Sequence, residues 1–168
     1  LSGRGGIAAA RRMGFVGLIA AMMGLAGVFT LPPLDRDEAR FAQASAQMLE
    51  TGDFIVIRFQ DEERNKKPAG AYWLQAASVA AFSDAKAREI WAYRLPSVFA
   101  AALAAIFAYA AIARLFDPAA GVLCALFVAT APVFSAEAMI AKTDALLLAC
   151  VAAAGAALAH LFADARAR

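Results

Sequence analysis

Charged residues are absent from four stretches of this 168-residue chain, and each of these stretches has 19 to 22 residues. They lie between Arg12 and Asp35, between Arg94 and Arg114, between Asp117 and Glu137, and between Asp144 and Asp164. A helix needs roughly 17–25 residues to cross the hydrocarbon core of a bilayer. Hydrophobic residues make up 62% of the chain, whereas roughly 45–50% is typical of soluble domains. We therefore predict an all-α integral membrane protein with four transmembrane helices.

The four predicted spans cover about residues 13–30, 96–113, 119–134 and 145–162 of a single membrane domain, residues 1–168. Arginines flank the first and the last span, at Arg4, Arg11, Arg12, Arg166 and Arg168. Such basic flanks stay in the cytoplasm by the positive-inside rule. An even number of spans agrees with this rule, because both ends of the segment then face the cytoplasm. The outer loop, about residues 31–95, is expected on the non-cytoplasmic side.

Small residues inside the spans predict close packing between helices. Ala20 and Gly24 are four residues apart, and alanines surround Gly155, a pattern typical of helix contacts in membranes. Cys124 and Cys150 also lie in uncharged stretches, and their spacing fits neither a disulfide framework nor a metal site. We interpret both cysteines as packing residues.

The outer loop holds most of the charge, with nine of the sixteen Lys and Arg and ten of the fourteen Asp and Glu. Because acids and bases are interleaved and the net charge is only +2, we expect no nucleic-acid partner. Residues 37–50 begin with carboxylates and are followed by the stop signal Gly52. Their apolar residues fall at helical spacing, at Phe41, Ala44, Met48 and Leu49. We interpret this segment as an amphipathic helix on the membrane surface.

The rest of the loop is expected to be extended, then exposed, then helical. Residues 54–59 favour an extended segment, and the charged residues 60–67 favour an exposed loop. Pro68 can open a second short helix. Aromatic residues near the spans are predicted to anchor the protein at the depth of the lipid headgroups, namely Tyr72, Trp73, Trp91 and Tyr93.

Polar residues directly after the first span have a structural and a functional interpretation. Asp35, Asp37 and Glu38 follow a pair of prolines. Carboxylates at this position can cap the helix that follows and complement its dipole. Alternatively, a carboxylate held at the membrane boundary can face a cavity, where partial desolvation raises its basicity for proton abstraction.

Two further groups of polar residues also have a structural and a functional interpretation. Lys66 and Lys67 stand beside Pro68, where two ammonium groups can hold a phosphate or simply belong to a solvated loop. Lys142 and Asp144 lie at the outer end of the fourth span, where they can mark a function or snorkel to the interface. The predicted topology places all three groups on the non-cytoplasmic side, so they could surround one cavity.

Three segments follow one another in a recognisable order: Asp-Glu-Ala-Arg-Phe at residues 37–41, Lys-Pro-Ala-Gly-Ala-Tyr-Trp-Leu at 67–74, and Arg-Leu-Pro-Ser at 94–97. Thr143 and Asp144 form a shorter match. Together these segments resemble the polyprenol-phosphate-sugar-dependent membrane glycosyltransferases of the GT-C fold. That group includes the protein O-mannosyltransferases and the aminoarabinose transferases.

The resemblance implies that the chain is the N-terminal portion of a longer enzyme in the bacterial inner membrane, inactive by itself, with its active-site loop in the periplasm. Such an enzyme takes a sugar from a polyprenyl-phosphate donor and passes it to a lipid, glycan or protein acceptor, in contact with membrane lipids. The resemblance further implies that Asp37 is the catalytic base and that Lys67 lies by the donor phosphate. A single displacement at the anomeric carbon would invert its configuration.

Other residues of the matched segments are expected to support these two. Glu38 joins Asp37 as a catalytic candidate, and Lys66 joins Lys67 at the donor phosphate. Asp144, Lys142 and Arg94 are expected behind the residues that touch the substrate. The family often has glutamate where this chain has Lys66, and a second proline where it has Ala69. We predict no metal ligand among these residues, and leave a divalent cation open as a cofactor.

Two other functional classes stay open. A non-catalytic membrane scaffold explains the spans and the helix caps, but it leaves three polar groups on one face to coincidence. A transporter fragment would place polar residues nearer the middle of a span and would favour helices broken by glycine or proline. Pro132 is the residue that approaches this pattern, and it lies close to the end of a predicted span.

Overall fold

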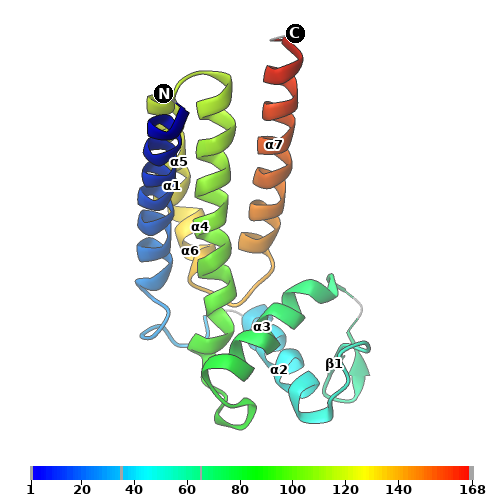
Figure 1. The fold of residues 1–168 in the computed structure, drawn as a ribbon. Coiled ribbons are helices and arrows are strands. Elements are labelled where there is room, and N and C mark those ends of the chain that lie inside the picture. Colours follow the sequence, from blue (N-terminus) through cyan, green and yellow to red (C-terminus); the bar gives the residue numbers. More distant parts are fainter. Residues whose placement is uncertain (1, 35, 65, 167–168) are drawn as a thin grey trace.

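The computed structural model describes residues 2–34, 36–64 and 66–166 and shows a bundle of long helices with a polar layer at one end (Figure 1). The long helices are α1 (Ser2–Leu25), α4 (Ile90–Leu115), α5 (Pro118–Thr130) and α7 (Asp144–Arg166), and the short α6 (Pro132–Ala138) follows α5. The polar layer contains α2 (Arg36–Thr51), α3 (Ala69–Phe82), and the strands β1 (Arg58–Phe59) and β2 (Glu62–Glu63). We call this layer, with residues 139–143, the polar end, and the opposite end, which carries both termini, the terminal end.

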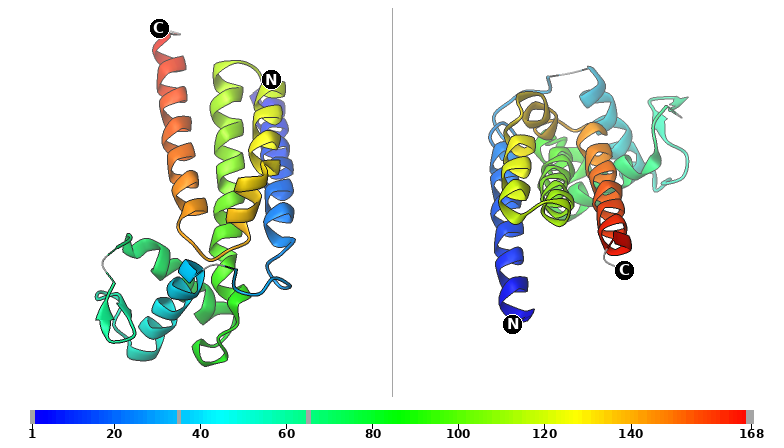
Figure 2. Two further views of the ribbon diagram at one scale, coloured as in Figure 1. Left: turned by 180° about the vertical axis from the view of Figure 1, so that it is seen from behind. Right: turned by 90° about the horizontal axis from the view of Figure 1, so that it is seen from above.

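Three helices are long and apolar enough to cross a membrane: Gly5–Leu25 within α1, then α4 and α7. The helices α5 and α6 form a fourth candidate span that is bent by 65°. The predicted all-α membrane protein is therefore confirmed. Figure 2 shows α4 in the middle of the bundle, and α4 packs against α1, α5 and α7.

The first span is shifted relative to its predicted bounds. The helix ends at Leu25 instead of residue 30, and residues 26–30 form turns, with the Val28 N–H donating to Leu25 O. The backbone leaves the helix here because the carbonyl groups of Gly27 and Val28 accept hydrogen bonds from a buried arginine, Arg94. The apolar composition of residues 26–30 could not reveal this, since their carbonyls and not their side chains make the contact.

The third predicted span, residues 119–134, is broken in the structure. Asp117 caps α5 by accepting hydrogen bonds from the N–H groups of Ala119 and Ala120 at 2.7 and 3.0 Å. The break falls at Ala131, whose ψ of 122° is extended, because proline disfavours the helical conformation in the residue before it. Pro132 then becomes the first residue of α6. The prediction of one continuous helix was therefore wrong.

Alanine and glycine allow the helices of the bundle to approach closely. Ala100 and Ala104 of α4 form a buried cluster with Ala145 and Ala149 of α7. At Gly121, an added Cβ would lie 2.8 Å from Ala113 Cβ, so α5 can sit this close to α4 only with glycine there. Close packing is also present at Gly24, where a Cβ would lie 3.4 Å from Ala138 and Val98. In the alanine-rich stretch around Gly155, Ala156 is buried, whereas Gly155 itself faces open space, where a Cβ would meet no atom within 4 Å.

Helix α2 has the predicted apolar face and ends as predicted. Phe41, Ala44 and Met48 are buried, and Gly52 takes a φ of 72° just after the helix, a conformation that glycine adopts without strain. The apolar face packs inside the protein, because the rings of Phe41 and Tyr72 stack with their centroids 4.9 Å apart. The face is thus covered by α3 and is not turned toward lipid.

The segment between α2 and α3 contains less extended structure than predicted. Of the predicted extended residues 54–59, Arg58 and Phe59 form a strand, which pairs antiparallel with Glu62 and Glu63. Gln60 takes a left-handed conformation in the turn, and its backbone N–H and C=O bond the amide side chain of Gln47. The helix after Pro68 begins as predicted but extends to Phe82.

Two of the four aromatic residues predicted as headgroup anchors lie in the protein core. Tyr72 and Tyr93 are 0% and 1% exposed, so the prediction is wrong for both. Trp73 is about half exposed, and its indole N–H donates to Phe54 O at 2.7 Å. The ring of Trp91 lies 5.6 Å from that of Phe29.

Candidate functional site

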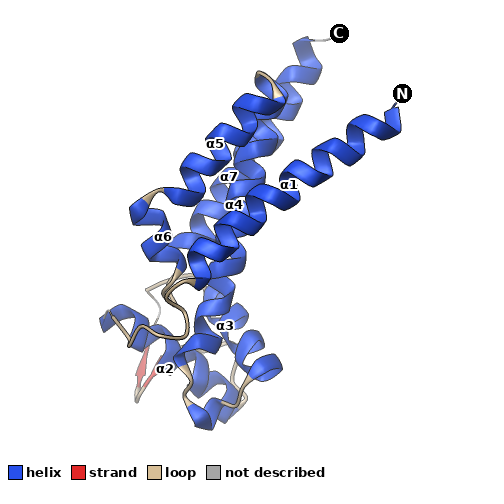
Figure 3. Ribbon diagram, turned by 90° about the vertical axis from the view of Figure 1, so that its left-hand side faces the viewer, coloured by secondary structure: helices blue, strands red, loops and turns tan. Residues whose placement is uncertain are grey.

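The structure gathers the predicted polar groups at the polar end of the bundle (Figure 3). Asp37 and Glu38 stand in the first turn of α2, Lys66 and Lys67 precede α3, and Lys142 and Asp144 surround the start of α7. Asp35 lies outside the described residues. The helices that carry these groups begin or end here, so their backbone termini and side chains meet at one boundary of the bundle.

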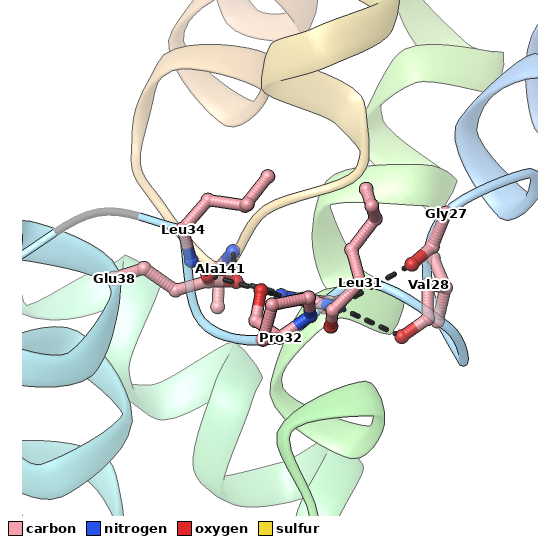
Figure 4. Close-up of polar contacts among 8 residues, drawn as sticks. Gly27, Val28, Leu31, Pro32, Leu34, Glu38 and Ala141 are labelled. Atoms are coloured by element: carbon pink, nitrogen blue, oxygen red, sulfur yellow. Dashed lines mark hydrogen bonds and ion pairs between the residues drawn. The ribbon is translucent and has the colours of Figure 1, made fainter.

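Glu38 and Arg94 form an ion pair in the protein interior, and both side chains are 0% exposed. The Nε and Nη2 groups of Arg94 donate to the two carboxylate oxygens of Glu38 at 2.7 and 3.0 Å. The same carboxylate accepts from the backbone N–H groups of Leu34 and Ala141 at 3.0 and 2.9 Å (Figure 4). Burial of two charges is tolerated when every donor and acceptor is satisfied, and Glu38 meets this condition.

The remaining donors of Arg94 bind the backbone after α1. Nη1 donates to Val28 O and Leu31 O at 3.0 and 2.8 Å, and Nη2 donates to Pro32 O at 3.0 Å. One arginine therefore joins the end of α1, the start of α2 and its own helix α4, while Glu38 adds the loop before α7. Both side chains thus hold these elements together inside the protein, and neither is exposed.

Asp37, the neighbour of Glu38, lies in a different environment. Its side chain is 48% exposed and has two arginines near it, with Arg40 Nη1 at 3.5 Å and Arg64 Nη2 at 3.9 Å from Oδ1. The two guanidinium groups beside this half-exposed carboxylate can also attract an anion to the same place. Asp37 is therefore accessible to a substrate, as a catalytic base must be.

Arg64 was missed by the sequence reasoning, which assigned it to an exposed charged loop. Its side chain is only 11% exposed. The guanidinium lies 5.5 Å from the centroid of the Phe41 ring, and Nε donates to the Tyr72 hydroxyl at 3.1 Å. These contacts fix a positive charge beside Asp37. No local sequence signal distinguishes Arg64 from the other arginines of the loop.

Lys67 and Asp144 line one pocket of about 350 Å³ between the start of α3 and the start of α7. Thr143 is the third polar residue of the lining, and the rest is small or apolar: Pro68, Gly70, Ala71, Leu74, Leu146, Leu147 and Cys150. The sequence separates the lysine from the aspartate by more than seventy residues, so only the fold brings them together. Lys66 is exposed and does not line this pocket.

A larger apolar groove of about 520 Å³ continues from this pocket between α3, α4 and α7. The two cavities share Leu74, Leu146 and Cys150. Apart from Ser78, the groove is lined by apolar side chains and Cys150, among them Phe82, Phe99 and Phe107. The combined cavity thus has a charged mouth at Lys67 and an apolar body along two membrane helices.

A proline in α4 explains why α3 lies across this groove. Pro96 has no N–H, so the carbonyl group of Ala92 one turn earlier loses its helical partner. The Ser78 hydroxyl of α3 replaces that partner and donates to Ala92 O at 2.6 Å. Ser45 of α2 also bonds α3, through Gln75 at 2.8 Å. The Arg-Leu-Pro-Ser segment therefore holds α1 and α2 through Arg94 and α3 through Pro96.

Lys142 lies behind Asp144, away from the pocket lining. Its Nζ is 3.5 Å from Glu137 Oε2 and 3.8 Å from Asp144 Oδ2. Lys142 and Asp144, both expected behind the residues that touch the substrate, thus form an ion pair with each other. Glu137, near the end of α6, completes this group. Among the described residues, no group of three His, Cys, Asp or Glu side chains could hold a metal ion.

Comparisons with known proteins assign the chain to a family. Residues 66–168 match the family described as dolichyl-phosphate-mannose-protein mannosyltransferase. The chain belongs to this family of membrane glycosyltransferases. The matched residues include Lys67, Arg94 and Asp144, and therefore both sides of the pocket.

Individual relatives carry a different printed name. The undecaprenyl phosphate-alpha-4-amino-4-deoxy-L-arabinose arabinosyl transferase of Pseudomonas aeruginosa is 33% identical over 125 residues, which cover 70% of this chain and 22% of that protein. The enzyme of the same name from Yersinia pestis is 36% identical over 87 residues, or 49% of this chain and 15% of that protein. The chain thus spans about a fifth of the length of these relatives. No solved structure matches the chain.

Proposed function

We propose that the protein transfers a sugar from a polyprenyl-phosphate donor to a lipid, glycan or protein acceptor, with inversion at the anomeric carbon. One observation carries this proposal: the pocket at Lys67 opens into an apolar groove between α3, α4 and α7. A donor of this class has an anionic phosphate next to a long apolar chain. The mouth of the cavity suits the phosphate and its body suits the start of the polyprenyl chain.

The chemistry requires a base for the acceptor and positive charge for the leaving group. The acceptor oxygen attacks the anomeric carbon, the bond from this carbon to the phosphate oxygen breaks, and polyprenyl phosphate leaves. Asp37 takes the acceptor proton, and Lys67 stabilises the charge that grows on the phosphate. Arg64 holds Asp37 in place, while Asp144 orients Lys67 across the pocket.

The polar end is proposed to face the periplasm, with both termini in the cytoplasm of a bacterial cell. The basic flanks of the chain support this orientation, and both termini lie at the same end of the bundle. Cysteines introduced singly at Asp61 and at Arg166, in a background lacking Cys124 and Cys150, test it in intact cells treated with an impermeant thiol reagent. Labelling at Asp61 alone supports the orientation, and equal labelling at both positions contradicts it.

Cys150 offers a direct test of the donor site, because it lines both the pocket and the groove. In the full-length protein, undecaprenyl phosphate should slow the reaction of Cys150 with a maleimide, and undecaprenol without phosphate should do so much less. Lys67→Ala should remove the difference between the two lipids. Lys66→Ala, a change of the exposed neighbour, should preserve it. Equal labelling with and without undecaprenyl phosphate would contradict a donor site in this cavity.

The role of Asp37 as the catalytic base is tested separately, by measuring the rate of sugar transfer. Asp37→Asn in the full-length enzyme should keep donor protection of Cys150 but reduce the transfer rate roughly 10²–10⁴-fold, as expected for loss of a general base. Asp61→Asn is the control, since Asp61 is an exposed carboxylate in the same outer segment. An Asp37→Asn enzyme as fast as the parent would return Asp37 to a purely structural role.

A further inference from the structure

A second cavity lies at the terminal end of the bundle, opposite the donor pocket. It has a volume of about 490 Å³ and is bordered by α1, α4, the start of α5 and α7. Figure 3 shows the first turns of α1 leaning away from α4 and α5, and Gly5, Ala8 and Ala9 of these turns line the cavity. Nothing in the glycosyl transfer proposed above uses it.

The lining of this cavity combines cationic and apolar groups. Arg12 of α1 and Arg114 in the last turn of α4 contribute guanidinium groups, and His160 of α7 contributes an imidazole. No carboxylate is among the described residues that line it. Asp164, outside the lining, forms an ion pair with Arg114 and so draws this side chain toward α7. Two helices therefore present arginines around one opening.

The deeper wall of the cavity is apolar. Tyr109 belongs to the buried cluster at the contact of α1 and α4, and the partly buried Met13 packs against this cluster. The α1 side is built from Gly5, Ala8 and Ala9, whose small side chains leave the space open. A Cβ added at Gly5 would meet no atom within 4 Å. The cavity thus offers guanidinium groups at its rim and an apolar surface below them.

We infer that this cavity binds an anionic phospholipid by its phosphate headgroup. Guanidinium groups are suited to bidentate bonds with phosphate oxygens, and basic pockets between membrane helices are suited to anionic lipid headgroups. Arg12 and Arg114 hold the phosphate, His160 donates a further hydrogen bond, and an acyl chain lies along Met13 and Tyr109. A free phosphate ion shares the headgroup chemistry but has no use for the apolar wall.

Binding of lipid to the purified full-length protein, measured by native mass spectrometry, tests this site. Phosphatidylglycerol should bind more tightly than phosphatidylcholine. Arg12→Gln and Arg114→Gln should each weaken phosphatidylglycerol binding about fivefold, the effect of removing one basic residue near an anionic headgroup. Arg11→Gln is the matched control, because Arg11 is an exposed arginine on the same helix that does not line the cavity.

A second variant separates shape from charge. Gly5→Leu changes no charge and should fill the cavity, so it should weaken phosphatidylglycerol binding while helix α1 stays intact. Displacement of the lipid by millimolar inorganic phosphate would show that the site takes the free ion and would overturn the inference. An equal loss of binding in Arg11→Gln and Arg12→Gln would also overturn it, because general surface charge would then suffice.

Discussion

The polar end and the helical bundle are stabilised by different kinds of contact. In the polar end, individual hydrogen bonds join the elements, such as Ser45 with Gln75 and Glu38 with Arg94. In the bundle, α4 meets α5 and α7 through alanines and through Gly121. Directional bonds fix the position and orientation of side chains, whereas small residues fix only how close two helices come. The part of the chain that carries the proposed catalytic residues is the part built from directional bonds.

Asp37 and Glu38 show this division within two consecutive residues. Glu38 is fully buried and its two oxygens accept four hydrogen bonds. Asp37 is half exposed and faces two arginines at 3.5 and 3.9 Å. The buried residue anchors the first turn of α2, and the exposed residue can then present its carboxylate at a fixed place. Changes that break the two kinds of contact should therefore have different consequences.

The largest effect is expected for the Glu38–Arg94 pair. Glu38→Ala leaves the guanidinium of Arg94 buried without its carboxylate, which should lower the free energy of unfolding by about 3–5 kcal/mol. The loss is measured as a lower apparent melting temperature of the full-length protein in detergent. Turnover should fall as well, because the start of α2 carries Asp37.

A matched control for this change is the exposed pair of Glu50 and Arg88, whose Oε1 and Nη2 atoms lie 2.6 Å apart. It also joins α2 to the segment before α4, but its side chains are 35% and 42% exposed. Glu50→Ala should cost no more than about 1 kcal/mol, because exposed ion pairs are screened by water. Equal melting temperatures for the two variants would show that burial of the Glu38–Arg94 pair has no energetic importance.

The next largest effect is expected in the bundle, at Gly121. Gly121→Ala places a Cβ 2.8 Å from Ala113 Cβ and 3.0 Å from Tyr109 O, so α5 must move away from α4, at a cost of about 1–3 kcal/mol. Gly155→Ala is the control within the same protein, since its Cβ meets nothing within 4 Å. Alanine there should leave the melting temperature unchanged or raise it, because alanine favours the helix. A destabilised Gly155→Ala variant would place an unexpected partner on that face of α7.

A smaller effect is expected where α3 docks on α4. Ser78→Ala removes the hydroxyl that donates to Ala92 O and should cost about 0.5–1.5 kcal/mol, the usual net value of a hydrogen bond. In a Pro96→Ala background the Ala92 carbonyl regains a helical N–H, so the same serine change should cost almost nothing. The difference between the two backgrounds is measured by a double-mutant cycle of melting temperatures. Equal costs in both would mean that Ser78 acts elsewhere.

The same division explains which features the sequence could predict. The spans follow from uncharged stretches and α2 follows from helical spacing, because both patterns are local. The Glu38–Arg94 pair joins residues 56 positions apart, and its only sequence signal is an arginine at the edge of an apolar stretch, where a charge needs a partner. The approach of Lys67 to Asp144 depends on how α3 and α7 each pack against α4, which no local pattern encodes. The resemblance to a known family supplied both residues without their geometry.

The smallest effect is expected at Asp53, in the turn between α2 and β1. Its carboxylate accepts hydrogen bonds from the backbone N–H groups of Val56 and Ile55, both at 3.0 Å, and these bonds hold the pKa of Asp53 below its ordinary value. A carboxyl group with a lowered pKa stabilises the fold at pH values above the unfolded pKa. This contribution should be lost as the pH falls below about 4 and the carboxylate takes a proton. In the parent protein, hydrogen exchange at the amides of Ile55 and Val56 should therefore accelerate in acid, relative to the intrinsic exchange rate. In Asp53→Asn, exchange at both amides should already be fast at neutral pH. Asp61→Asn, a change of an exposed carboxylate in the hairpin turn, is the control and should leave exchange at both amides unchanged. Faster exchange of these amides in Asp61→Asn would mean that general charge, and not these two hydrogen bonds, controls the turn.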